Sequence, residues 1–118
     1  MRWLAAILLT TLAGCPICSD GELRVVGGAD PVVVNGALDL ELHYGDTVLG
    51  PGRCGGYWTV EGIEGGDTTV GTIDTCGHFV APATAPAQPV TIAAASDAPG
   101  TCADCCPYGS RTVIVLQP

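Results

Sequence analysis

Residues 36–44 constrain the fold most strongly, because apolar and polar side chains alternate along them one by one. In this stretch, "GALDLELHY", Leu38, Leu40 and Leu42 alternate with two acidic residues and a histidine. A period of two matches a β-strand, whose successive side chains point to opposite faces, and does not match a helix. The alternation therefore predicts a half-buried strand with one face in a core and the other toward solvent.

The rest of the chain is divided into short apolar runs. The whole chain has 17 glycines and 9 prolines, and those between these runs give the pattern of strands joined by turns. Further strands are expected at residues 22–26, 31–34, 57–61, 68–74, 78–82, 89–96 and 111–117. About seven strands with turns between them predict an all-β fold, an antiparallel β-sandwich.

Glycine and proline also fix local details of these strands. Residues 27–30 are expected to kink an edge strand. Pro31 follows the kink, and an edge strand tolerates a proline because its missing N–H is not needed for pairing. Residues 75–77 are predicted as a turn between two strands. Residues 89–96 contain alanines that favour a helix, but the shortness of the run and its flanking prolines favour a strand.

The charge balance excludes one large class of partners. The 118 residues, enough for one domain, carry 4 basic side chains, all arginine, against 12 acidic ones, for a net charge of −8. A protein that binds DNA or RNA needs a basic surface to neutralise phosphates. The sequence therefore predicts no nucleic-acid partner.

The N-terminus has the layout of a bacterial export signal. Arg2 precedes an apolar run at residues 3–13 that is too short to span a bilayer as a permanent helix. Residues 12–15, "LAGC", resemble the lipobox of bacterial lipoprotein signals, in which the peptide is cut before the cysteine and the cysteine receives lipid. The resemblance implies removal of residues 1–14 and lipidation of Cys15. The alternative is an ordinary signal peptide cut nearby, which would leave Cys15 as a free or disulfide-bonded thiol.

The lipobox resemblance also implies a location. Two or more acyl chains are enough for stable anchoring in a membrane. We therefore expect an exported protein that is lipid-anchored in the bacterial cell envelope, at the outer membrane. Residues 15–21 would form a short tether, and residues 22–118 would form the single domain.

Six cysteines remain beyond the expected anchor: Cys18, Cys54, Cys76, Cys102, Cys105 and Cys106. The directions of the expected strands place all six at one pole, the end nearest the lipid. An even number of cysteines in an exported domain predicts a disulfide framework. Cys105 and Cys106 are adjacent, so we expect them to bond to different loops. The favoured scheme joins Cys54 and Cys76 to residues 101–110 and leaves Cys18 to hold the N-terminal strand.

Two other uses of these cysteines stay open. Cys102 and Cys105, together with Cys54 or Cys76 and with His78, form a reasonable ligand set for tetrahedral zinc. Cys102 and Cys105 also have the spacing of a thiol-redox pair, although no helix N-terminus is expected there to lower the thiol pKa. Either use would give the protein a metal-binding or electron-handling role in the envelope.

Four stretches follow one another along the second half of the chain in a recognisable order: "WTVEG" at 58–62, "GTI" at 71–73, "GHFVAP" at 77–82 and "VTIAAAS" at 90–96. Together they resemble a bacterial Ig-like domain of the type found in bacterial surface and secreted proteins. The resemblance covers about residues 33–118 and departs from the family in its many cysteines. It implies an Ig-like β-sandwich and a non-catalytic module without an active site.

Other side chains give weaker signals. Trp58 is expected in the core rather than stacked on a sugar, and His43 is expected toward solvent. Glu61, Glu64 and Asp67 lack the regular spacing of a calcium-binding loop, so we expect a solvated acidic turn. No serine is matched by a histidine and an acid in a recognisable catalytic motif, and no phosphate-binding glycine loop is found.

These observations predict a protein that is not an enzyme and uses no cofactor. Its expected role is structural or adhesive. It would present strands and the loops far from the membrane to a protein or glycan partner at the cell surface.

Overall fold

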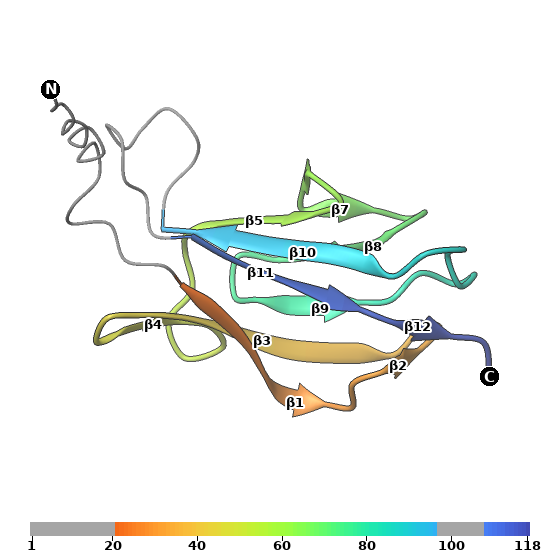
Figure 1. Ribbon diagram of the computed structural model, residues 1–118, viewed down its shortest axis with the longest axis horizontal. Coiled ribbons are helices and arrows are strands. Elements are labelled where there is room, and N and C mark those ends of the chain that lie inside the picture. Colours follow the sequence, from red (N-terminus) through yellow and green to blue (C-terminus); the bar gives the residue numbers. More distant parts are fainter. Residues whose placement is uncertain (1–20, 97–107) are drawn as a thin grey trace, which may run out of the picture.

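The computed structural model describes residues 21–96 and 108–118, which form an all-β structure without a helix (Figure 1). Its strands are β1 (Glu22–Gly28), β2 (Val32–Val33), β3 (Ala37–Tyr44), β4 (Thr47–Leu49), β5 (Tyr57–Val60), β6 (Ile63–Glu64), β7 (Gly66–Asp67), β8 (Gly71–Ile73), β9 (His78–Val80), β10 (Val90–Ala95), β11 (Tyr108–Val113) and β12 (Val115–Leu116). Nothing within these ranges is a helix with the length and apolar character needed to span a bilayer.

Two main sheets organise the strands. The first has the order β1-β3-β9-β8-β7, with β4 paired to β3, and the second has the order β11-β10-β5-β6. All pairings within these two sheets are antiparallel, as predicted. Side chains from both sheets form one hydrophobic core, an arrangement that is compatible with a β-sandwich.

Strand β3 forms as its alternating sequence predicts. Leu38, Leu40 and Leu42 are completely buried, whereas the polar side chains between them are partly exposed. Val60 of β5 and Ile92 of β10 are also completely buried and belong to the same core cluster. The core therefore lies between the two main sheets, and the period of two in the sequence identifies its face on β3.

The N-terminal strand is divided between two sheets. Strand β1 pairs with β3 and has a bulge between Val25 and Gly27. The chain then turns, and β2 pairs in parallel with β12, where the Val32 N–H donates to the Ile114 carbonyl at 3.0 Å. The predicted kink at residues 27–30 is confirmed. It carries the chain away from the first sheet to the C-terminal strand.

Several boundaries differ from the prediction. Glu61 and Gly62 have positive φ angles of 53° and 78°, which suits a tight two-residue hairpin turn. Strand β5 therefore ends before Glu61 and turns back into β6, a strand that the sequence analysis does not predict. The run at residues 89–96 is a strand, as predicted. Strand β11 begins at Tyr108 rather than at residue 111.

Candidate functional site at the disulfide pole

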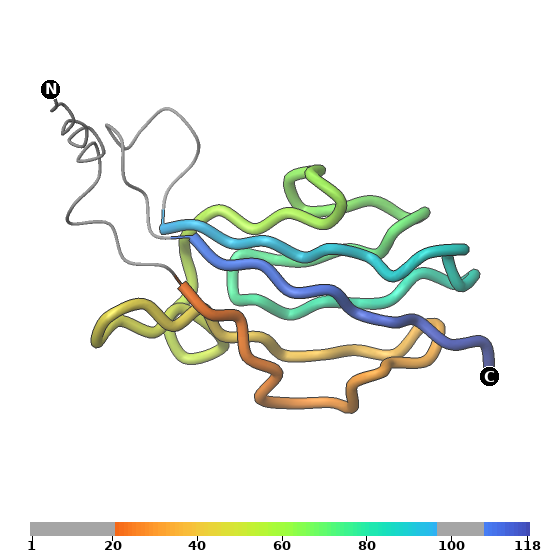
Figure 2. The backbone as a smooth tube through the Cα atoms, viewed as in Figure 1, coloured from red at the N-terminus to blue at the C-terminus, as the bar shows by residue number. Residues whose placement is uncertain are grey.

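One end of the molecule gathers segments that are far apart in the sequence, and we call it the disulfide pole (Figure 2). Cys54 precedes β5 and Cys76 precedes β9, and a disulfide bond joins them across a sequence separation of 22 residues. The Gly55 N–H donates to the Thr75 carbonyl at 2.9 Å, so the two loops are also held together by their backbones. Because β5 and β9 belong to different sheets, the bond links the two sheets.

The disulfide corrects the predicted pairing scheme. Cys54 and Cys76 are disulfide cysteines, as predicted, but they bond to each other and not to residues 101–110. Their Cα atoms lie 4.1 Å apart, because the turn at residues 75–77 faces the loop that leads into β5. As disulfide cysteines, Cys54 and Cys76 have no thiolate to offer to zinc, so the zinc alternative loses both of these ligands.

The remaining cysteine predictions concern residues outside the described ranges: Cys15, Cys18, Cys102, Cys105 and Cys106. The described chain reaches those ranges at the disulfide pole. The Gly21 N–H donates to the Tyr108 carbonyl at 2.7 Å, and Ala95 pairs with both Tyr57 and Tyr108. Gly21, Ser96 and Tyr108, the described residues next to the two undescribed ranges, thus lie at the same end of the molecule as Cys54 and Cys76.

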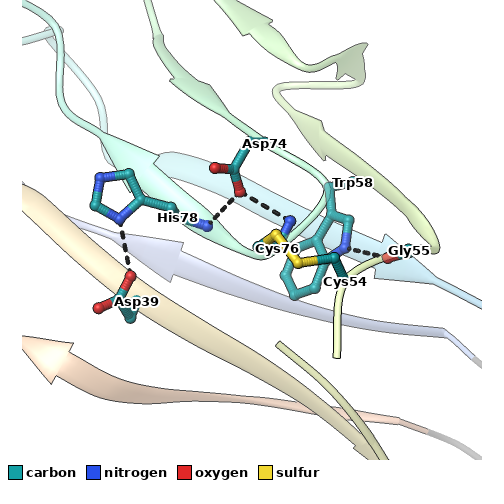
Figure 3. The surroundings of a disulfide bond; sticks show 7 residues. All are labelled: Asp39, Cys54, Gly55, Trp58, Asp74, Cys76 and His78. Carbon is teal, nitrogen blue, oxygen red and sulfur yellow. Dashed lines mark hydrogen bonds and ion pairs between the residues drawn. A yellow bond between two sulfur atoms is a disulfide. The ribbon is translucent and has the colours of Figure 1, made fainter. Parts of the chain in front are cut away.

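Trp58 forms the buried wall behind the disulfide (Figure 3). Its side chain is 3% exposed, and its indole Nε1–H donates to the Gly55 carbonyl at 3.0 Å. Gly77 packs so closely that a Cβ atom there would lie 2.4 Å from the Leu40 carbonyl oxygen and 2.9 Å from the indole ring. The predicted core position of Trp58 is confirmed, and this burial removes it as a surface for stacking a sugar.

The turn that carries Cys76 is closed by Asp74. One carboxylate oxygen of Asp74 accepts hydrogen bonds from the N–H groups of Cys76 and His78, at 2.8 Å and 3.0 Å (Figure 3). An aspartate that accepts from backbone groups a few residues later stabilises tight turns. The predicted turn at residues 75–77 is therefore confirmed, and the side chain that holds it is identified.

Replacing Asp74 with alanine should lower the free energy of unfolding by about 1 kcal/mol, because two N–H groups lose their protein partner but remain accessible to water. Urea unfolding monitored by circular dichroism measures the change. Asp74→Asn is the matched control, since its side-chain oxygen can still accept both bonds. Equal destabilisation by alanine and asparagine would show that the charge of Asp74, and not its acceptor role, stabilises the turn.

Both histidines form pairs with carboxylates on the outer face of the first sheet. His78 Nδ1 lies 2.8 Å from Asp39 Oδ1, on adjacent strands β9 and β3, and the two side chains are 46% and 41% exposed. An ion pair this exposed contributes little to stability. His43 Nε2 lies 2.8 Å from Glu41 Oε1. The side chain of His43 is 25% exposed and lies on the side of β3 opposite the buried leucines, so its expected direction toward solvent is confirmed.

The described residues contain no group of three or more histidine, cysteine, aspartate or glutamate side chains placed to hold a metal ion. Two of the three acidic residues considered for calcium have other contacts. Glu61 Oε2 accepts from the Thr91 N–H at 2.6 Å, and Asp67 Oδ1 accepts from the N–H groups of Thr69 and Val70. Residues 68–70 therefore form a turn, and the strand expected from residue 68 starts only at Gly71.

Two of the concavities in the described part of the chain bear on the choice of a binding site, and the sequence indicated neither. A groove of about 490 Å³ lies between residues 68–70 and residues 83–87, and it has neither charged nor aromatic side chains in its lining. A slot of about 120 Å³ lies on the outer face of the second sheet, between Tyr57 and Tyr108. Of these two concavities, only the slot has aromatic side chains in its lining.

Comparison with known proteins gives no match: no family model, no curated protein and no solved structure matches this chain. The bacterial Ig-like resemblance and the lipobox resemblance therefore stay predictions. What the protein does has to be argued from the disulfide pole, the slot and the sequence motifs.

Proposed function

We propose that this protein is a non-catalytic, lipid-anchored protein of the bacterial cell envelope, with a structural or adhesive role and a single Ig-like domain. The observation that carries the proposal is the Cys54–Cys76 disulfide. Structural disulfides form and persist in oxidising compartments outside the cytosol. A disulfide-linked domain is therefore what the export signal at residues 1–14 leads us to expect.

The position of the disulfide pole supports an anchor at Cys15. The first described residue, Gly21, is bonded to Tyr108 at this pole. Six residue steps separate Gly21 from Cys15, and an extended chain covers about 20 Å in that distance. A lipid on Cys15 would hold the disulfide pole close to the membrane and would leave the opposite end of the domain free for a partner.

Three observations support an Ig-like domain. Two antiparallel sheets share one core, and the N-terminal strand is divided between two sheets. Ig domains also place a core tryptophan against a disulfide that links their sheets. Here the residues that follow the two cysteines, Gly55 and Gly77, both contact Trp58.

Replacing Cys15 with serine is expected to abolish membrane anchoring. In a bacterial host that expresses the full chain with radiolabelled palmitate, the wild-type protein should carry label and sediment with the outer membrane. Cys15→Ser should carry no label and should leave the membrane fraction, because lipidation requires the thiol and two or more acyl chains supply the anchoring free energy.

Cys18→Ser is the matched control, since it removes a neighbouring thiol outside the lipobox and should keep both label and membrane association. The proposal fails if Cys15→Ser still sediments with membranes to the wild-type extent. It also fails if the mature wild-type protein does not begin at Cys15 when its N-terminal peptide is sized by mass spectrometry.

A further inference from the structure

The slot on the outer face of the second sheet lies beside the disulfide pole and is built from three adjacent strands. Tyr57 and Thr59 come from β5, residues 93–95 from β10, and Tyr108 from β11. Ala95 is the register partner of both Tyr57 and Tyr108. Directly paired residues point to the same face of a sheet, so two tyrosines stand on either side of an alanine.

The spacing of these strands leaves room for one ring. Neighbouring strands lie about 4.8 Å apart, so the Cα atoms of Tyr57 and Tyr108 are separated by about 10 Å. For a ring to stack between two aromatic rings, those two rings must lie about 7–8 Å apart, which is twice the usual carbon contact distance. The next row across the sheet consists of Thr59, Ala93 and Ser110. Small side chains on the floor therefore leave the space between the tyrosines open.

The exposed surface of the slot is almost entirely apolar. Thr59 is buried, with 8% of its surface exposed, and the described residues that line the slot include no charged side chain. The nearest register neighbour on β6 is Glu64, the partner of Thr59, and the chain carries a net charge of −8. An anionic ligand is therefore disfavoured, whereas a neutral ligand with an apolar face matches the lining.

We infer that the slot binds a neutral glycan, with one sugar ring held between Tyr57 and Tyr108. The C–H faces of a sugar ring are apolar and stack on tyrosine, while the hydroxyls at the edge of the ring stay in contact with water. A volume of about 120 Å³ is well below the roughly 300 Å³ of a pocket for a whole drug-sized ligand, so it suits one unit of a longer chain.

A peptide fits this surface less well. The backbone N–H and C=O groups of β10 are used by its two neighbours β5 and β11, so the centre of the face has no main-chain partners for an extended peptide. The glycan assignment rests on the proposed envelope location, which places the slot near the polysaccharides of the cell surface. The glycan assignment makes the partner of the proposed adhesive role a glycan. It also places the binding site near the disulfide pole, and not on the loops at the opposite end of the domain.

Titration of the full chain with neutral hexasaccharides tests the inference. Cellohexaose, maltohexaose and hexa-N-acetylchitohexaose, all uncharged, are the probes, and saturation-transfer NMR detects their contact with the protein. Ala95→Leu should weaken binding of the preferred probe at least tenfold by filling the slot while leaving both tyrosines in place. Tyr57→Ala and Tyr108→Ala should each weaken it by about tenfold, the scale of one lost stacking contact, and the phenylalanine variants should stay within about threefold.

Ile114→Ala is the matched control, because Ile114 is an exposed apolar residue between β11 and β12 and lies outside the slot. Its affinity should equal that of the wild type, and circular dichroism should show that all variants are folded. The inference is overturned if no probe binds at millimolar concentration, if Ala95→Leu binds as the wild type does, or if a proline-rich peptide binds more tightly than every glycan. If the protein is lipidated at Cys15 but binds no probe, the glycan inference is wrong and the proposed anchor stands. If it binds a probe but is not lipidated, the proposed anchor is wrong and the glycan inference stands.

Discussion

Replacing Trp58 with alanine is expected to lower the free energy of unfolding by about 3–5 kcal/mol, the usual cost of removing a large buried aromatic side chain. The indole is 3% exposed and belongs to the core shared by both sheets. Its removal also leaves the Gly55 carbonyl without its donor. Urea unfolding followed by far-UV circular dichroism measures the loss.

Two further variants separate the sources of this effect. Trp58→Phe keeps an aromatic ring but lacks the N–H, so we expect a smaller loss of about 1–2 kcal/mol. Ile114→Ala removes a side chain that is 51% exposed and should change the free energy of unfolding by less than about 0.5 kcal/mol. A Trp58→Ala variant no less stable than Ile114→Ala would contradict the assignment of Trp58 to the core.

The parts of the fold that the sequence predicts are those set by local side-chain patterns. The alternation in β3 identifies Leu38, Leu40 and Leu42 as core residues, and all three are completely buried. The same reasoning places Trp58 and Val60 on the inner face of β5. A period of two can be read from a few consecutive residues, because it follows from the geometry of a single strand.

The parts that the sequence does not predict depend on contacts between distant residues. The parallel pairing of β2 with β12 joins Val32 to Val115, and no local pattern specifies that partner. The slot was missed for the same reason. Tyr108 falls in a segment expected to be a loop, and only the register of β10 with its two neighbours brings it opposite Tyr57.

The disulfide illustrates the same limit. Strand directions predict that Cys54 and Cys76 share a pole, and they do. Six cysteines allow 15 pairings, however, and sharing a pole does not choose among them. The choice follows from the Gly55–Thr75 backbone contact, which depends on how the loop before β5 meets the turn before β9.

Replacing both Cys54 and Cys76 with alanine should lower the free energy of unfolding by about 3 kcal/mol. Closing a loop of 22 residues removes about that much conformational free energy from the unfolded chain. The melting temperature should fall accordingly, because a domain of this size has only about 5–15 kcal/mol of total stability. Urea unfolding of the oxidised wild type and of the double variant gives the difference directly.

Adding a reductant distinguishes the stabilising effect of the Cys54–Cys76 bond from that of any other disulfide in the protein. If Cys54–Cys76 is the bond that matters, reduction should cost the wild type about 3 kcal/mol more than it costs the double variant. The single variant Cys54→Ala should expose one new thiol, at Cys76, to maleimide after unfolding without reductant. A peptide map that links Cys54 or Cys76 to residues 101–110 would restore the scheme expected from the sequence. In that case no disulfide would join the loop before β5 directly to the turn before β9 beside Trp58. Each cysteine would instead be bonded to the segment between β10 and β11.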